Sequence, residues 1–589
     1  MQNGSNGAKT IETDVAILGG GPTGSTCATF LRKYNPDLRV TIVEKEVFPR
    51  EHVGESQLPS IGPILDEMGV WDKVEAEGFP IKIGASYTWG AKLDRWDFDF
   101  YPVELWKDEP RPAKFEGQRR HTAFQVDRDR YDEILLHHAR DMGADLLQPV
   151  RVIDIPVVDD HVQGFVLDDG RTLKAKHYVD GSGTVGLVRR ALGVEVDAPE
   201  QLRNIAVWDY WENAEWAVEI GVGGTRVQVR SLPYGWMWFI PLGPTRTSIG
   251  LICPASKYKE MGLSVDELYL KAIADQPEIT ALTKNGTRTM ETRSCKDWSQ
   301  LADRLVGPNW FICGEAAGFA DPILAAGMSL AHSSGREAAY SILELERGEL
   351  DAAWIRDRFN TRNRTNIRQH IQFAQYWYAA NTCFTDLKDH CTAIAKQAGL
   401  RLSPDQAWRW LSQGGFTTES VGIPTFGSFD VACTKQILER FDAKDRKTPY
   451  LADGYNVFEL NLHNAKDSTI GVLGQGRINM VPCYERGNAR LPLVGYYKVV
   501  VDTLKLTSDA REMTEIFQRT VGSSSMTALT LCMQALDTMI QESWVLRKKD
   551  SKRPVMHVGN EGNRFVRSSE DTAEALAKSK TKPTYKSNL

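Results

Sequence analysis

Residues 14–24, DVAILGGGPTG, decide the fold of this chain. An apolar run ends at Leu18, and a G-x-G-x-x-G pattern follows with Gly19, Gly21 and Gly24 at its fixed positions. The first glycine allows a tight turn, the second lets the backbone approach a pyrophosphate, and the third lets a helix pack on a strand. The N-terminus of that helix attracts an anion. The stretch therefore predicts a strand, a phosphate-binding turn and a helix.

A second strand completes this unit. The run Val40–Val43 is rich in β-branched residues and ends at Glu44. Strand, turn, helix and strand within about 30 residues have the size of a βαβ unit. Glu44 is placed to accept hydrogen bonds from a ribose 2′-hydroxyl. We therefore expect an α/β fold with a Rossmann-type dinucleotide site that includes Thr23 and Glu44. A glycine turn between ordinary elements is the alternative.

Composition and charge exclude several classes of protein. The chain has 589 residues, 71 basic and 77 acidic, and its net charge of −6 argues against a nucleic-acid partner. No apolar run approaches the roughly 18–20 residues needed to cross a membrane. The opening MQNGSNGAKT lacks the apolar segment of a secretory signal. Nine cysteines without a C-x-x-C pair predict reduced thiols, a cytoplasmic protein and no metal cluster.

Hydrophobic patterns divide the chain into three regions. Residues 1–345 are expected to form the α/β core, with a mostly antiparallel substrate sheet from about 82–120 and 200–300. Residues 346–560 are expected to form a helix-rich C-terminal domain, with helices predicted at 351–380, from Ser403, at 509–520 and at 526–546. Residues 561–589 are polar and are expected to form a flexible tail.

Two further segments resemble the second and third flavin-contact motifs of the FAD-dependent aromatic hydroxylase fold. They are VDGSG at Val179–Gly183 and FICGEAAG at Phe311–Gly318. The resemblance implies FAD contacts from Gly314 and from Glu315, where that fold usually carries aspartate. It also implies a contact on the flavin side from Arg128, which opens a helix. The alternative for Arg128 is a surface ion pair.

The segment 236–241, WMWFIP, reads W-x-W-x-I-P and resembles the signature of flavin-dependent halogenases. The resemblance implies a wall beside the flavin formed by Trp236, Trp238, Ile240 and Pro241. Such a wall keeps the organic substrate away from the reactive face of the flavin, while halide is small enough to reach it. An aromatic core strand of an ordinary flavoprotein is the alternative.

Lys82 is the second part of this resemblance. It lies in the apolar segment 79–85, FPIKIGA, after Gly54-Glu55-Ser56. An unpaired buried ammonium is costly, so a buried lysine here would be paired or functional. The family has a lysine here, between the flavin and substrate pockets, that hydrogen-bonds hypohalous acid as an ammonium or forms a haloamine as an amine. The alternative is a half-exposed strand with Lys82 turned outward.

The third match is FADPILAAG at 319–327, which is similar to the family's F-x-x-P-x-x-S-x-G stretch with Ala325 in place of serine. Small residues let the backbone approach an anion. We therefore expect Pro322 near the flavin and a halide at the N–H groups of Ala326 and Gly327. Leu324 stands where tryptophan halogenases carry glutamate, which argues against free tryptophan as the substrate.

Taken together, these motifs imply a flavin-dependent halogenase, with a general likeness beyond residue 345 to the longer, chloramphenicol-pathway type. The expected reaction uses FADH2, O2 and chloride or bromide to halogenate an electron-rich, phenolic or similarly activated substrate through hypohalous acid guided by Lys82. The expected partners are a separate flavin reductase and a small aromatic or acyl substrate, free or on a carrier protein. Monomer and dimer stay open.

Two other functions fit the same motifs. One is an FAD-dependent monooxygenase or reductase of the same fold, which activity without halide would favour. The other is a non-catalytic flavoprotein that binds a partner through its C-terminal domain. Failure to bind FAD, together with tight binding to a carrier protein, would favour that reading. The sequence does not identify a catalytic base, and His121 and His332 are candidates only.

Overall fold

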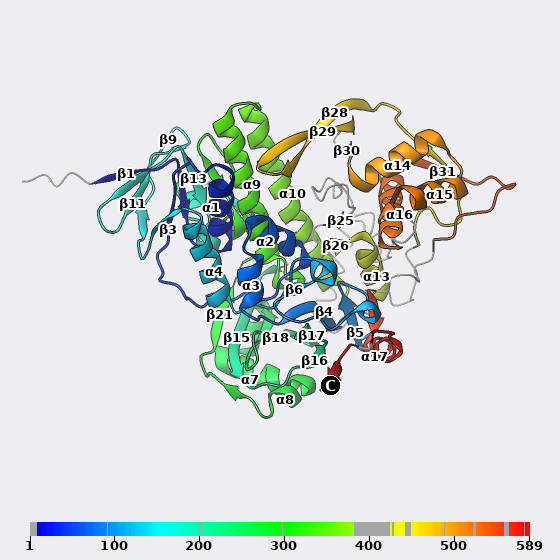
Figure 1. Cartoon of the computed structure of the whole chain (residues 1–589). Coiled ribbons are helices and arrows are strands. Elements are labelled where there is room, and N and C mark those ends of the chain that lie inside the picture. The colour runs from blue at the N-terminus through cyan, green and yellow to red at the C-terminus, as the bar shows by residue number, and fades with distance from the viewer. Residues whose placement is uncertain are drawn as a thin grey trace, which may run out of the picture.

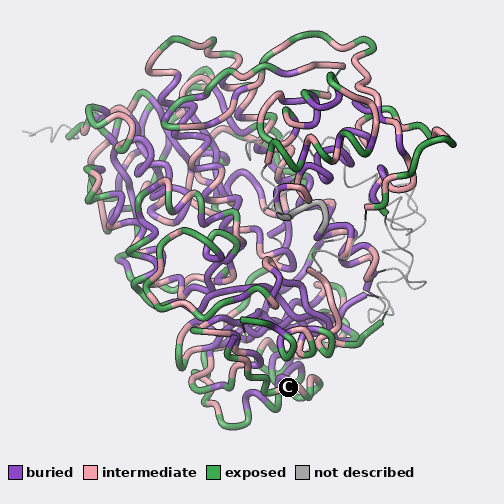
Figure 2. The backbone as a smooth tube through the Cα atoms, turned by 45° about the vertical axis from the view of Figure 1, so that its right-hand side comes forward, coloured by how far each residue is buried: buried purple, intermediate pink, exposed green. Residues whose placement is uncertain are grey.

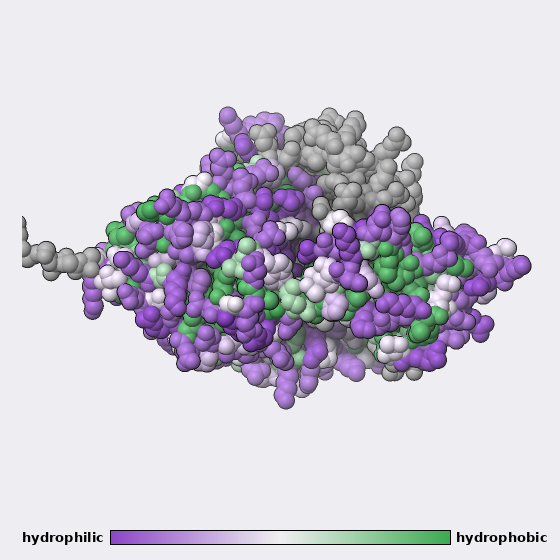
Figure 3. Space-filling view, turned by 90° about the horizontal axis from the view of Figure 1, so that it is seen from above, coloured by the Kyte–Doolittle hydropathy of each residue, from purple (hydrophilic) through white to green (hydrophobic). Residues whose placement is uncertain are grey.

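The computed structural model describes residues 9–90, 92–199, 202–296, 298–381, 425–426, 429–441, 449–487, 489–521, 526–558, 565–581 and 583–589. Two sheets with their covering helices occupy one side of the molecule, and the last group of helices lies beside them (Figure 1). Buried residues run through the interior of the molecule, and exposed residues lie mostly at its periphery (Figure 2). The face seen from above is mostly hydrophilic, with apolar residues in small patches (Figure 3). No helix among the described residues is long and apolar enough to cross a membrane.

A five-stranded parallel sheet carries the predicted glycine turn. Its strand order is β23-β13-β2-β3-β7. Helix α1 (Pro22–Tyr34) follows β2 across the glycine turn and packs against α4 (Arg128–Asp141) and α9 (Gly327–Arg347). The predicted βαβ unit is therefore confirmed. The strands are β2 (Val15–Leu18), β3 (Val40–Val43), β7 (Asp145–Leu147), β13 (His177–Asp180) and β23 (Trp310–Ile312).

A twelve-stranded sheet forms the second layer, with the main path β20-β15-β19-β18-β17-β4-β5-β32. Among its described pairings, β17 and β4 run parallel and the others antiparallel, so the mostly antiparallel sheet is confirmed. Its strands are β4 (Ile81–Thr88), β5 (Arg95–Asp99), β6 (Ala123–Phe124), β15 (Asn204–Glu212), β16 (Val218–Ile220), β17 (Gly224–Leu232), β18 (Gly235–Pro241), β19 (Arg246–Pro254), β20 (Thr287–Arg288), β21 (Arg293–Lys296), β32 (Val566–Ser568) and β33 (Tyr585–Ser587).

Short elements connect and cover these two sheets. The helices are α2 (Gly62–Met68), α3 (Trp71–Ala76), α5 (Leu187–Ala191), α6 (Ala255–Met261), α7 (Val265–Asp275) and α8 (Pro277–Thr283). The short 3-10 helices are η1 (Pro59–Ile61), η2 (Val103–Leu105), η3 (Gly117–His121), η4 (Gly183–Val185), η6 (Gly314–Ala316) and η7 (Pro322–Leu324). The small strands are β1 (Thr10–Glu12), β8 (Val152–Asp154), β9 (Val157–Val158), β10 (His161–Val162), β11 (Phe165–Leu167), β12 (Thr172–Lys174), β14 (Val196–Asp197), β22 (Gln300–Ala302) and β24 (Gly318–Phe319).

The C-terminal half begins with the long helix α10 (Ala352–Ala379), close to the range predicted for it. Its buried side chains join the apolar cluster of the parallel sheet, whereas most buried apolar side chains described between Ala452 and Val545 form a cluster of their own. The division into domains at residue 346 stays a prediction, and the helix predicted from Ser403 lies outside the described residues. The remaining elements are α13 (Val431–Phe441), α14 (Gly495–Leu506), α15 (Ala510–Val521), α16 (Met526–Gln541), β25 (Thr425–Phe426), β26 (Phe429–Asp430), β27 (Val457–Leu460), β28 (Lys466–Gly474), β29 (Arg477–Arg486), β30 (Ala489–Pro492) and β31 (Val545–Lys548).

Within residues 565–581 and 583–589, the end of the chain contains two strands and a helix that join the large sheet, whereas the sequence predicted a flexible tail over 561–589. Strand β32 pairs with β5, helix α17 (Ser569–Lys578) follows it, and β33 pairs with β16. The polar composition of this segment suggested disorder. Its polar side chains instead form ion pairs and hydrogen bonds with the core: Arg567 pairs with Glu104 of η2 at 2.7 Å.

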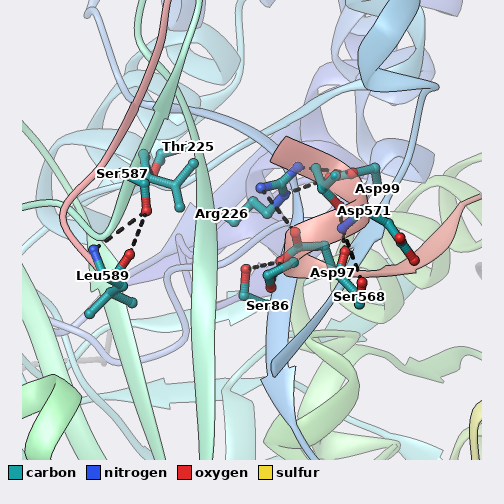
Figure 4. A network of polar contacts seen from close by, with 12 residues as sticks. Ser86, Asp97, Asp99, Thr225, Arg226, Ser568, Asp571, Ser587 and Leu589 are labelled. Carbon is teal, nitrogen blue, oxygen red and sulfur yellow. Dashed lines mark hydrogen bonds and ion pairs between the residues drawn. The ribbon is translucent and has the colours of Figure 1, made fainter. Parts of the chain in front are cut away.

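A buried ionic cluster lies where this segment meets the sheet (Figure 4). The Arg226 guanidinium donates to both carboxylate oxygens of Asp99 at 2.6 and 2.9 Å and lies 3.5 Å from Asp97. Asp97 also accepts hydrogen bonds from Ser86 at 2.5 Å and from Ser569 at 3.0 Å. Arg226 is 1% exposed, so water does not screen these charges. The cluster therefore ties the last helix to the middle of the sheet.

Replacing Arg226→Met is expected to lower the free energy of unfolding by about 3–5 kcal/mol, because two buried carboxylates lose their cation. A shift of the urea unfolding midpoint measures the loss. The matched control is Lys586→Met, which removes an exposed ion pair with Glu219. That change is expected to cost less than about 1 kcal/mol. Equal shifts for the two variants would contradict a stabilising role for the cluster.

Candidate functional site

The glycine turn leaves no room for side chains. Gly19 has φ +99°, and a Cβ there would lie 2.4 Å from the carbonyl oxygen of Gly181. A Cβ on Gly24 would lie 1.9 Å from the Gly19 carbonyl oxygen. Gly21 precedes α1, and no side chain caps the helix, so the N–H groups of its first turn lack partners within the helix. The turn therefore presents backbone donors to an anion such as a phosphate.

Glu44 closes the turn from the end of β3. Its Oε2 atom accepts from the Gly20 N–H at 2.7 Å, and its Oε1 atom accepts from the Glu46 N–H at 2.8 Å. The side chain is buried and lines the same cavity as Gly19, Gly21 and Thr23. Because each carboxylate oxygen carries two lone pairs, Glu44 retains acceptor capacity for a hydroxyl.

Arg128, the first residue of α4, is held rigidly. Its Nε and Nη2 atoms donate to the Asp132 carboxylate at 2.8 and 2.9 Å. Its Nη1 atom donates to the carbonyl oxygens of Val53 and Gly54, each at 3.1 Å. Arg128 is 6% exposed and lines the cavity, so its ion pair is buried and not on the surface. The guanidinium therefore presents a fixed positive charge to the cavity.

Gly314 and Glu315 form the turn after β23. Gly314 has φ +58°, and a Cβ there would lie 2.3 Å from Thr23 Oγ1. The Gly314 N–H donates to Ser334 Oγ at 2.8 Å. Glu315 lines the cavity, and burial raises its pKa while the positive charge of Arg128 opposes that rise. The turn thus brings a carboxyl group and a close-packed backbone to the same side as the first glycine turn.

The W-x-W-x-I-P segment forms strand β18, which is buried along its whole length. Alternation along the strand points Trp236, Trp238 and Ile240 toward the cavity, which all three line. The two indole rings are tilted by 57° with centroids 6.2 Å apart. Pro241 ends the strand and does not line the cavity among the described residues. The segment therefore supplies an aromatic wall.

The ring of Trp238 lies flat across the neighbouring strand β19. It sits opposite Gly250 in the strand register, and a Cβ on Gly250 would lie 2.2 Å from the ring. Its Nε1 atom donates to Ser248 Oγ at 3.1 Å. Glycine leaves the space for the ring and the serine hydroxyl fixes its direction, so the face of the indole, and not its edge, forms the wall.

Lys82 lies inside the molecule on β4 and is 2% exposed, so the half-exposed alternative is wrong. Its Nζ atom donates to the Gln57 carbonyl oxygen at 2.8 Å and lies 5.4 Å from the centre of the Phe100 ring. Within the described part of the chain, no carboxylate pairs with it. Burial lowers the pKa of Lys82 to about 7. Ammonium and amine are therefore both populated near neutral pH.

The segment from Asp321 to Gly327 contributes another part of the cavity lining. The Asp321 carboxylate accepts from the Ile323 N–H at 2.9 Å and so caps the turn η7. Ala325 has φ +52°, and α9 begins two residues later, at Gly327. Pro322, Ala325 and Gly327 line the cavity, whereas Ala326 does not. A helix N-terminus therefore faces the cavity beside the aromatic wall.

One cavity of about 800 Å³ joins these features. One end is polar and includes Glu44, Arg50 and Arg151. The other end is apolar and carries Lys82. Four of the predicted site residues do not line the cavity: Gly24, Gly314, Pro241 and Ala326. The predicted residues that do line it are Gly19, Gly21, Thr23, Glu44, Lys82, Arg128, Trp236, Trp238, Ile240, Glu315, Pro322 and Gly327.

Sequence reasoning missed Glu55. This carboxyl group lines the cavity, is 2% exposed, and accepts from the Tyr210 hydroxyl at 2.9 Å. Burial raises the pKa of Glu55 to about 7, although the Tyr210 hydrogen bond opposes the rise. A group that titrates there can exchange protons within the cavity. His332, a candidate base, instead bonds Thr26 and Tyr131 through its two ring nitrogens, each at 2.8 Å.

Comparisons with known proteins agree with this arrangement. The FAD binding domain family matches residues 12–374. The chain is 34% identical over 350 residues to the tryptophan 2-halogenase of Chondromyces crocatus, a match that covers 58% of this chain and 63% of that protein. It is 31% identical over 389 residues to the 1H-pyrrole-2-carbonyl-(peptidyl-carrier protein) chlorinase of Pseudomonas fluorescens, covering 63% of this chain and 85% of that one.

Two solved structures share the fold. The myxobacterial chondrochloren halogenase CndH matches with a TM-score of 0.57 and 27% identity over 66% of this chain and 90% of its own. The flavin-dependent halogenase CmlS matches with a TM-score of 0.69 and 24% identity over 94% of this chain and 99% of its own. The second match extends the shared fold through the C-terminal half.

Replacing Gly250→Ala is expected to force the Trp238 ring out of its place on β19. Such overpacking costs about 1–3 kcal/mol of folding free energy. The near-ultraviolet circular dichroism of the indoles should change as well. The control is Gly243→Ala in the turn of the same hairpin, where an added Cβ meets open space. If both variants unfold at the same urea concentration as the wild type, Gly250 does not determine the position of the Trp238 ring.

Proposed function

The chain belongs to the FAD binding domain family and, within it, to the flavin-dependent halogenases, and we propose that it halogenates an electron-rich aromatic substrate with reduced FAD, O2 and a halide. The observation that carries this proposal is Lys82, a buried amine at the apolar end of the cavity that pairs with no carboxylate among the described residues. The other end has the bare backbone of a dinucleotide site. The aromatic wall adjoins both ends.

The polar end fits the cofactor. Gly21 lines the cavity without a side chain, so the backbone of the turn can lie against a pyrophosphate. Glu44 retains acceptor capacity for ribose hydroxyls, and Arg128 and Glu315 face the flavin side. When bound, reduced FAD supplies the oxygen chemistry, and the protein supplies binding, orientation and electrostatics. A separate reductase would provide the reduced form.

The chain's own residues then divide the work. Trp236 and Trp238 keep an organic substrate away from the flavin side. Of the two residues expected at the halide, Gly327 lines the cavity and Ala326 does not, so the backbone N–H of Gly327 holds the halide. Hypohalous acid that reaches Lys82 accepts a hydrogen bond from the ammonium, or reacts with the neutral amine to give a haloamine and water. The pKa of about 7 makes both forms available near neutral pH.

The apolar end supports an aromatic substrate without a free carboxylate. Its lining includes Ala85, Tyr87, Phe98, Phe100, Val227 and Val229. Among the described residues of β4, β5 and β17, Lys82 is the basic side chain that lines the cavity. Because Lys82 is proposed to hold the halogen, it is not available to bind a substrate carboxylate. We therefore place a phenol or a pyrrole, free or on a carrier protein, ahead of an amino acid. The Chondromyces relative is named for tryptophan, so tryptophan belongs in the substrate panel.

Replacing Lys82→Met is expected to lower the yield of halogenated product about 100-fold or more, because the variant cannot hold or transfer the halogen. The assay combines the protein with FAD, a generic flavin reductase, NADH and bromide, against phenols, pyrroles and tryptophan. Mass spectrometry detects the bromine isotope pattern. FAD affinity should stay within about twofold, because Lys82 lies outside the polar end.

The matched control is the exposed lysine variant Lys284→Met, which should halogenate at the wild-type rate. Full activity in Lys82→Met would contradict the role of the amine. Hydroxylated product formed without halide would instead make the protein a monooxygenase of the same fold.

A further inference from the structure

A buried hydrogen-bond chain joins three parts of the sequence that lie far apart. The Trp236 Nε1 atom lies 2.8 Å from the Tyr378 hydroxyl oxygen, which lies 3.0 Å from Asp321 Oδ1. Trp236 is 2% exposed, Tyr378 7% and Asp321 0%. These residues come from β18, α10 and the segment before η7. These hydrogen bonds therefore connect the aromatic wall to the neighbouring Asp321–Gly327 segment through the last turn of α10.

The chemistry of the three groups fixes the direction of these bonds. An indole N–H can only donate, so the Tyr378 oxygen accepts from Trp236. The tyrosine hydroxyl has one hydrogen, which it gives to the Asp321 carboxylate. The Tyr378 hydroxyl thus both accepts and donates, and removing it takes this acceptor away from the buried Trp236 N–H.

Asp321 also holds the turn that follows it, η7, through hydrogen bonds. The same Oδ1 atom accepts from the Ile323 N–H at 2.9 Å, and Oδ2 accepts from the Asn204 amide at 3.3 Å. The capped turn leads to Ala325 in the left-handed region and then to the start of α9 at Gly327. A movement of the carboxylate would therefore move the backbone at the proposed halide site.

The ring of Tyr378 has packing that does not depend on its hydroxyl. Trp89 contacts Tyr378 edge to face at 5.9 Å and Trp236 at 6.3 Å. A phenylalanine at position 378 would keep these contacts and remove the two hydrogen bonds. The structure thus offers a way to separate the packing of the helix from the bonding of its hydroxyl.

We propose that Tyr378 is a positioning residue for the halide site: its hydroxyl holds the Trp236 indole and the Asp321–Gly327 turn at a fixed separation. The inference rests on the proposed function, because it assigns the halide to that turn. Tyr378 lies just outside the residues that match the FAD binding domain family. The last turn of α10 therefore completes a site whose other parts belong to the matched region.

The test compares Tyr378→Phe with the wild type. We expect the KM for bromide to rise about tenfold, because the turn at the halide site loses the hydrogen bond from Tyr378 that holds it in place. The FAD dissociation constant and the KM for the organic substrate should stay within about twofold. The matched control is Tyr234→Phe, whose hydroxyl donates to Asp275 at 2.7 Å on the other face of the sheet. This control should leave all three constants unchanged.

A second readout does not depend on turnover. Indole N–H resonances of protein labelled with ¹⁵N-tryptophan report hydrogen bonding, and Trp236→Phe identifies the Trp236 signal among the 16 tryptophans. In Tyr378→Phe that signal should move upfield in the proton dimension.

A second variant provides a test if Tyr378→Phe folds poorly. Asp321→Asn keeps one carbonyl acceptor and should raise the bromide KM by less than Tyr378→Phe does.

The outcomes separate the two proposals. A shifted Trp236 signal with an unchanged bromide KM would overturn the positioning role while halogenation stands. An unchanged signal would show that the hydrogen bond is absent in solution, which also overturns the inference. A wild-type protein that binds FAD but forms no halogenated product with any substrate of the panel would overturn the proposed function and the inference with it.

Discussion

The amine of Lys82 can be buried without a counter-charge because it can lose its proton. Taking an ammonium out of water requires an anionic partner or a shift toward the neutral form. Lys82 has the Gln57 carbonyl as its acceptor, and its pKa falls to about 7. A carboxylate nearby would hold the amine protonated and remove the neutral fraction. The apolar walls from β4, β5 and β17 are therefore a condition of the chemistry at Lys82.

The large sheet meets that condition by separating charges between its two faces. Val227 and Val229 of β17 line the cavity, and the alternating residues Arg226 and Arg230 point to the opposite face. Arg226 pairs there with Asp99, and Arg230 with Glu278 at 2.5 Å. The charges on the far face hold the last segment of the chain. The face of the sheet that lines the cavity can therefore be apolar around the amine of Lys82.

What the sequence predicted correctly depends on local requirements. A glycine turn such as Gly19–Gly24 must have its residue types at fixed positions, and a strand such as β18 shows its aromatic residues at alternate positions. No local pattern distinguishes Gly250 from the other glycines among the 48 in the sequence. Its role depends on the strand register that places it opposite Trp238, which the sequence does not show. The tail was predicted to be flexible because its composition is polar. Its partners, such as Asp97, lie on a strand from the first part of the chain.

The C-terminal half is bound to the site by more than covalent connection. Tyr378 of α10 joins Trp236 to Asp321, and Phe441 of α13 packs against the ring of Trp377 with centroids 4.9 Å apart. Farther along, the Ile478 N–H donates to Glu344 of α9 at 2.8 Å in a buried position. A chain cut after α9 would leave the Trp236 N–H and the Asp321 carboxylate without their shared hydroxyl. The aromatic wall therefore depends on the last turn of α10 as well as on its own motif, which lies within the FAD-binding part.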